Sequence, residues 1–186
     1  MNPLVSTTGL SACAPAVAPL LVLAVGNPSR GDDALGPMLV ERLRATDIER
    51  DGEVELMTDF QLQVEHALDL DGRRAVLFVD AALPGAGGAE GLPEAGGGAR
   101  IETAEADDRV PPASHALRPQ AVLHVARRVC AAVPPAWLLA IEGVSFELGD
   151  GLSDVAERRL DEATRLALAW LRAQQARTGE ADACTS

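Results

Sequence analysis

Two carboxylates and one histidine are the side chains whose types and positions best suit a chemical role, namely Asp33, Asp80 and His115. Two carboxylates and a neutral imidazole can coordinate a borderline divalent metal and leave coordination positions open. Such a metal polarises a carbonyl or activates a water, whereas a close carboxylate pair can do acid–base work with no metal of the protein's own. The residues alone leave both kinds of chemistry open. The sequence contains no H-E-x-x-H pattern, so an ordinary zinc protease is not indicated.

Asp33 lies in a turn that reads Gly26-Asn-Pro-Ser-Arg-Gly-Asp-Asp33 and follows an apolar run. The spacing of its two glycines matches the G-x-x-x-x-G of a phosphate-binding loop, but that loop continues with Lys and then Ser or Thr. Two aspartates stand in those places and would repel phosphate, whereas a helix N-terminus stabilises negative charge. A helix cap accounts for one aspartate, and Asp32 is the better candidate for the cap. Asp33 is therefore the candidate for chemistry.

Asp80 directly follows the apolar run 75–79. Ligands of open α/β sheets bind beyond the carboxyl ends of the strands, so this position suits a functional side chain. If the first and third strands are neighbours, Asp33 and Asp80 open into the same crevice. An aspartate that only caps a turn is the alternative for Asp80.

The three histidines differ in their surroundings. His115 lies in a loop between prolines, and loops held by a rigid scaffold are where ligands and catalysts concentrate. A plain surface histidine is the alternative. His66 and His124 fall inside predicted helices, where a packing or surface role is the better interpretation.

The elements that must position these residues alternate between strands and helices. Apolar runs predict buried strands, and an alternating run predicts an edge strand; these are residues 20–25, 54–57, 75–79 and 137–141, with the edge strand over 100–104. Helical spacing and capping signals predict four helices; these are residues 35–43, 58–70, 120–132 and a last helix from Ser153. This alternation predicts an α/β sandwich with a mostly parallel sheet.

The chain is predicted to hold one domain, over residues 20–176. Residues 1–19 are expected to form a flexible N-terminal tail, and residues 177–186 a disordered C-terminal tail. Between them, the Gly-, Ala- and Pro-rich segment 84–98 is expected to be a flexible loop.

Charge and cysteine content exclude several classes of function. The formal net charge is -12, which disfavours binding to nucleic acids and to anionic membranes. The three cysteines are too few and too scattered for a disulfide framework. No Lys or Arg precedes Arg30, so a secretory signal is not indicated, and the apolar run 16–25 is too short to span a bilayer. A cytoplasmic location and a monomer are expected.

These residues together resemble the hydrogenase maturation proteases. The family signature G-N-x-x-x-x-D-[DE]-x-x-G is matched by residues 26–36, which read G-N-P-S-R-G-D-D-A-L-G. An aspartate then ends the third strand, and a histidine follows in a Ser/Pro loop just before a helix. The similarity covers roughly residues 20 to 175.

The resemblance implies a twisted five-stranded sheet between helices and an aspartic-type endopeptidase. The implied reaction removes a C-terminal extension from the large-subunit precursor of a nickel–iron hydrogenase after nickel has entered. Nickel carried by the precursor is the implied recognition element, and whether it also activates water stays open. The family's metal-binding positions fall on Asp33, Asp80 and His115, with the two aspartates also as catalytic candidates. Asn27, Asp59 and Gln61 are the expected substrate-binding residues.

One departure from the family is the stretch Thr58-Asp-Phe-Gln-Leu-Gln63, where many members have Asp-Gly-Gly-Thr. This variant looks like the subgroup that serves cytoplasmic NAD-reducing hydrogenases. It keeps Asp59 as a crevice residue but places the glycine-dependent substrate contact in doubt.

Two other classes of function remain as alternatives. A nucleotide-binding enzyme with a Rossmann-like sheet would need a G-x-G-x-x-G turn, which this turn does not match. A non-catalytic nickel-binding assembly factor would share the three ligands without cutting. A serine hydrolase is disfavoured because the sequence lacks a G-x-S-x-G elbow.

Overall fold

The computed structural model describes residues 17–83, 98–107 and 117–183, with side chains up to residue 177. Its centre is a five-stranded sheet in the order β2-β1-β3-β5-β4. The strands are β1 (Leu20–Val25), β2 (Val54–Asp59), β3 (Ala75–Ala82), β4 (Ala99–Ala104) and β5 (Ala136–Glu142). All neighbouring pairs are parallel except β4 with β5, so β4 is an antiparallel edge strand. The predicted mostly parallel sheet is confirmed.

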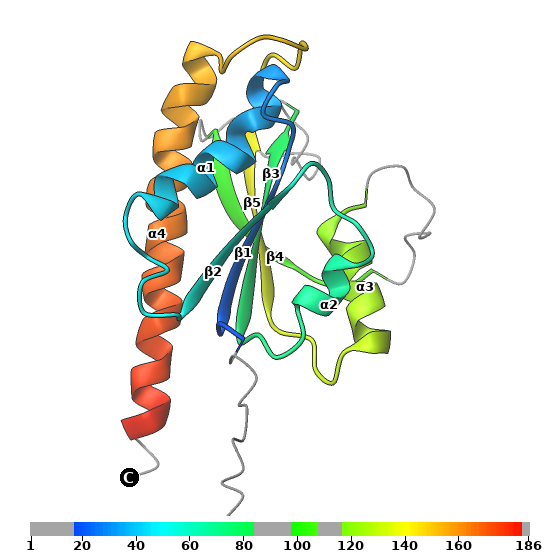
Figure 1. Cartoon of the computed structure of the whole chain (residues 1–186), viewed down its shortest axis with the longest axis vertical. Helices are drawn as coiled ribbons and strands as arrows, with labels where there is room; N and C mark the ends of the chain where they lie inside the picture. The colour runs from blue at the N-terminus through cyan, green and yellow to red at the C-terminus, as the bar shows by residue number, and fades with distance from the viewer. Residues whose placement is uncertain (1–16, 84–97, 108–116, 184–186) are drawn as a thin grey trace, which may run out of the picture.

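Helices cover both faces of the sheet. They are the short 3-10 helix η1 (Gly31–Ala34) and the α-helices α1 (Leu35–Arg44), α2 (His66–Asp69), α3 (Pro119–Val129) and α4 (Asp154–Ala183). In Figure 1, α1 and α4 lie on one side of the strands, and α2 and α3 lie on the other. The fold is thus the predicted three-layer sandwich. Within the described residues, no helix is long and apolar enough to cross a membrane.

The central strand β1 shows why an unbroken apolar run was needed. Leu20 and Val22 pack into the core beneath α1 and α4, whereas Leu21 and Leu23 pack into the core beneath α2 and α3. Successive strand residues point to opposite faces, so a strand covered on both faces must be apolar throughout. Burying each of these leucines contributes roughly 2 kcal/mol. This burial holds the carboxyl end of β1 in place.

Helix α4 begins as predicted and ends later than predicted. The Ser153 hydroxyl accepts a hydrogen bond from the Ala156 N–H at 3.1 Å, as expected of an N-cap. The face predicted to be apolar is buried; it consists of Ala156, Leu160, Ala163, Ala167, Trp170 and Leu171. The helix continues to Ala183, so the boundary predicted at residue 176 was too early.

The helix predicted over residues 58–70 was wrong. Thr58 and Asp59 continue β2, where they pair with Ala24 and Val25 of β1. Only His66–Asp69 form a helix, α2. Sheet pairing with a distant strand outweighed the local capping signal at Thr58. Asp59 therefore ends a strand instead of starting a helix.

Two smaller differences concern the ends of elements. β3 runs to Ala82, so Asp80 lies within the strand, close to its carboxyl end, and not after it. Helix α3 ends at Val129, three residues before the predicted end. Residues 1–16 of the predicted N-terminal tail and residues 84–97 of the predicted loop lie outside the described residues.

Candidate functional site

The carboxyl ends of β1 and β3 meet at the point where the chain changes direction across the sheet. From β1 the chain passes to β2 on one side, while β3 lies on the other side of β1. Such a switch point is where open α/β sheets bind their ligands. Ala24 pairs with Val79, so Asp80 is level with the end of β1. The short helix η1 carries Asp33 and packs against β3. The structure thus brings Asp33 and Asp80 to the same end of the sheet, beside the end of β1.

The charge of Asp33 acts on the carboxyl group of Asp80. Its pKa is raised from 3.8 to about 6, first by burial and then by the negative charge of Asp33, while a hydrogen bond from the Ala81 backbone opposes the rise. Burial and a like charge both penalise the ionised form. Asp80 can therefore gain or lose a proton close to neutral pH.

Asp33 is held by the turn that precedes it. Its Oδ2 accepts a hydrogen bond from the Asn27 N–H at 2.9 Å. The Asn27 side-chain oxygen in turn accepts one from the Ser29 N–H at 2.9 Å, which closes the turn. Asn27, expected to bind substrate, thus shapes the turn and orients Asp33.

Asp32 has a different role from the helix cap that was predicted. Its side chain is fully buried and makes no cap hydrogen bond in η1. Instead it accepts hydrogen bonds from the backbone N–H groups of Val144, Ser145 and Ser153 and from the Ser153 hydroxyl. Burial alone would raise its pKa, but these donors outweigh burial and lower it. Asp32 therefore anchors the loop after β5 and the start of α4 to the Asp33 turn.

Two glycines of the signature allow close backbone contacts that bring Asp33 to the strand end. A Cβ on Gly26, whose φ is +145°, would lie 2.0 Å from the Asp33 carbonyl oxygen. A Cβ on Gly36 would lie 2.4 Å from the Val25 carbonyl oxygen. Real Cβ atoms cannot approach so closely, so both positions require glycine. The glycines pack α1 onto β1 and do not serve a phosphate.

The backbone N–H groups of the turn already have partners within the protein. Those of Arg30 and Asp33 donate to carbonyls inside the turn. Those of Gly31 and Asp32 donate to Asp150 and Ser145 of the loop after β5. A phosphate loop needs these donors free. The structure therefore agrees with the exclusion of a phosphate site.

Asp59 lies beside this turn, and Gln61 lies apart from it. A cavity of about 350 Å³ opens between the ends of β1 and β2; its lining residues are Gly26, Pro28, Pro37, Thr58, Asp59 and Phe60. Gln61 is exposed and does not line the cavity. His66, assigned to packing from the sequence, is indeed buried, but its Nε2 lies 3.3 Å from Asp59 Oδ2. Sequence reasoning missed this pair because His66 was expected in the middle of a longer helix.

His115 lies outside the described residues, so its predicted place beside the two aspartates stays a prediction. Among the residues that the structure describes, no three His, Cys, Asp or Glu side chains gather closely enough to hold a metal. The Asp33–Asp80 pair nevertheless fits a divalent cation in its chemistry. The two carboxylates offer oxygen donors, and a cation between them would relieve the repulsion that raises the pKa of Asp80.

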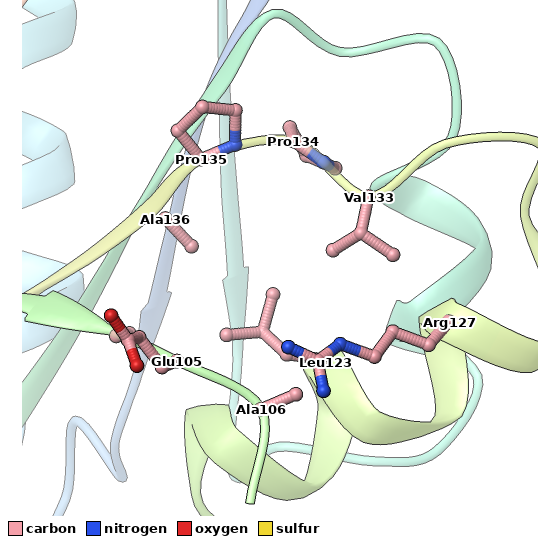
Figure 2. A pocket seen from close by; sticks show the side chains of 9 residues that line it. Glu105, Ala106, Leu123, Arg127, Val133, Pro134, Pro135 and Ala136 are labelled. Carbon is pink, nitrogen blue, oxygen red and sulfur yellow. The ribbon is translucent and has the colours of Figure 1, made fainter.

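A second cavity, of about 490 Å³, lies at the other edge of the sheet (Figure 2). It opens beside the start of β5 at Ala136, between Glu105 and the side chains of Leu123 and Arg127 on α3. Ala136 pairs with Val76, at the amino end of β3. The larger cavity thus lies near the amino ends of β3 and β5, whereas the carboxylate pair lies near the carboxyl end of β3.

Comparison with known proteins gives structural relatives only. No protein-family profile matches the chain, and no curated protein sequence matches it. The hydrogenase maturating endopeptidase HybD from E. coli superposes with a TM-score of 0.61 and 25% identity. The solution structure of an endopeptidase from E. coli gives 0.61 and 26%. Each comparison covers 83% of this chain and 93% of the relative.

A third relative shares the fold at lower identity. The [NiFe] hydrogenase maturation protease HycI from Thermococcus kodakarensis KOD1 has a TM-score of 0.60 and 21% identity, again over 83% of this chain and 93% of its own. The five-stranded sheet and the helices on its two faces are thus shared with these relatives. The chain therefore has the fold of these hydrogenase maturation endopeptidases.

Proposed function

We propose that this protein is an endopeptidase that removes the C-terminal extension of a nickel–iron hydrogenase large-subunit precursor after nickel insertion. The observation that carries the proposal is the Asp33–Asp80 pair at the switch point of a fold shared with hydrogenase maturation endopeptidases. The Thr58–Gln63 stretch supports a precursor from a cytoplasmic NAD-reducing enzyme.

The carboxylate pair suits peptide hydrolysis near neutral pH. A general base works best when its pKa lies close to the working pH, and that of Asp80 is about 6. Asp80 can take a proton from the attacking water and return it to the leaving amine. Asp33, which the Asn27 N–H orients, provides a second carboxylate beside Asp80. Nickel belongs to the substrate, and the oxygens of this pair, together with His115, are the proposed groups that recognise it.

Apolar side chains around the crevice support a protein as the substrate. Among the described residues, four large exposed apolar side chains lie in the segments that follow the carboxyl ends of β2, β3 and β5. They are Phe60, Leu83, Val144 and Leu148. Exposed apolar side chains that gather around a site are typical of protein-binding surfaces. The precursor would cover this rim while its C-terminal segment enters the crevice.

The test is a processing assay with purified components. The wild-type chain, incubated with nickel-loaded precursor, should lower the precursor's mass by that of its C-terminal extension, as measured by mass spectrometry. Asp51→Asn, a change at an exposed acid in the turn before β2, serves as the matched control and should process normally. Binding of the precursor without any loss of mass would indicate the non-catalytic assembly factor instead. Equal processing of nickel-free precursor would refute the recognition of nickel.

A further inference from the structure

The carboxylate of Asp59 is fixed on the wall of the cavity between β1 and β2. Its Oδ1 accepts the Phe60 N–H at 2.6 Å, and its Oδ2 lies 3.3 Å from His66 Nε2. The Asp59 backbone carbonyl accepts the Gly26 N–H at 3.0 Å. Asp59 is therefore tied to the first residue of the turn that carries Asp33, and its side chain has little freedom to rotate.

His66 presents its Nε2 to the carboxylate of Asp59. Its Nδ1 accepts the Gln63 N–H at 2.9 Å. A ring nitrogen that accepts a hydrogen bond carries no proton, so the proton lies on Nε2, the atom that faces Asp59 Oδ2. The bond to Gln63 thus selects the tautomer with its proton on the nitrogen nearest Asp59, as second partners of functional histidines do.

His66 and Asp59 differ in how far their side chains are exposed to solvent. The His66 side chain is 9% exposed, whereas that of Asp59 is 33% exposed. The imidazole is therefore almost entirely shielded from solvent, and His66 does not line the cavity. Asp59 keeps part of its carboxylate accessible to the cavity, where Pro28, Pro37 and the exposed Phe60 provide apolar walls. Such a cavity fits a peptide segment that offers apolar surface and a hydrogen-bond donor.

We propose that His66 is a positioning residue for substrate binding, because it holds the Asp59 carboxylate toward the precursor segment that enters this cavity. The inference rests on the proposed function, since the peptide is that of the hydrogenase precursor. His66 does not touch the substrate. It acts through Asp59, and its loss should weaken binding of the precursor without changing the chemistry at Asp33 and Asp80.

Two substitutions at residue 66 separate its hydrogen bond with Gln63 from its polar contact with Asp59. In His66→Asn, the side-chain oxygen can still accept the Gln63 N–H, but no donor reaches Asp59. In His66→Gln, the longer amide places a donor near the position of Nε2. We expect His66→Asn to raise KM for the precursor about tenfold, since Asp59 loses its polar contact with residue 66, with kcat within about twofold of wild type. His66→Gln should restore KM.

A purely structural role for His66 would give different results. An unchanged KM in His66→Asn, or an equal loss in both variants, would overturn the inference. In an Asp59→Asn background, His66→Asn should raise KM no further, since its effect passes through Asp59. The ¹⁵N shifts of His66 give a readout without activity, and a proton on Nδ1 would also overturn the inference.

The proposed function can fail separately from this inference. If the wild-type chain binds the precursor but does not cut it, the endopeptidase proposal fails. The role of His66 is then tested by measuring the Kd for the precursor, which His66→Asn should raise about tenfold. A wild-type chain that does not bind the precursor would refute both.

Discussion

Asp32 and Asp80 are both withdrawn from water at the same end of the sheet, yet their environments act on them in opposite directions. Asp32 receives four hydrogen bonds from Val144, Ser145 and Ser153, and its pKa is lowered. Asp80 has one backbone donor and a like charge beside it, and its pKa rises to about 6. Burial alone does not assign a role to a carboxylate. The supply of donors makes Asp32 a structural anchor and leaves Asp80 reactive.

The largest effect expected from this contrast is on activity. Asp80→Asn removes the group that exchanges the proton, so precursor processing should fall by about a thousandfold or more. Asp33→Asn should cause a loss of similar size. Circular dichroism should show an intact fold in both variants. Processing by either variant at more than a tenth of the wild-type rate would place the chemistry elsewhere.

Asp32→Asn should have its main effect on stability. The amide replaces one accepting oxygen with a donor that faces the donors of Val144 and Ser145, so the free energy of unfolding should drop by about 2–4 kcal/mol. Denaturant titration measures this change. A stability loss smaller than that of the exposed control Asp51→Asn would show that Asp32 is not an anchor.

The two carboxylates also differ in how they couple stability to pH. The folded-state pKa of Asp32 is lowered, so its contribution is present above its ordinary pKa of 3.8 and is lost as the pH falls below it. The folded-state pKa of Asp80 is raised, so ionising Asp80 costs stability as the pH rises from about 4 through about 6.

The smallest expected effect is on stability, and it follows from the raised pKa of Asp80. Asp80→Asn removes the cost of the ionised carboxylate, so at pH 8 the variant should be more stable than wild type by about 1 kcal/mol, because solvent screens part of the repulsion. At pH 4 this advantage should disappear. Thermal unfolding at the two pH values measures it, and an inactive variant that is also less stable at pH 8 would contradict the origin assigned to the raised pKa.

The sequence predicted that Asp33 and Asp80 would converge if the first and third strands were neighbours, and β1 and β3 do pair. Apolar runs identified β1 and β3, and parallel strands end at the same edge of a sheet, so residues beyond those ends had to converge. The role of Asp32 could not be predicted in this way, because its partners lie 112 to 121 residues further along the chain. No local pattern encodes such contacts.

The region around Asp59 was only partly predictable. Its place in the crevice could be expected, but the capping signal at Thr58 suggested a helix that would have carried His66 along its length. Pairing of Thr58 with Ala24 extends the strand instead, and the chain then turns back so that His66 meets Asp59. Contacts between strands, which a local reading does not include, decided the outcome. The part of His115 in the site stays a prediction.

The most direct test of the claim that Asp33 and Asp80 form one site is an NMR titration of the Asp80 carboxyl carbon. It should be measured in the wild-type chain and in Asp33→Asn. The account predicts a pKa of about 6 in the wild type and a lower pKa in the variant, because the charge of Asp33 contributes to the rise. A pKa that is the same in both proteins, or one close to 3.8 in the wild type, would contradict it.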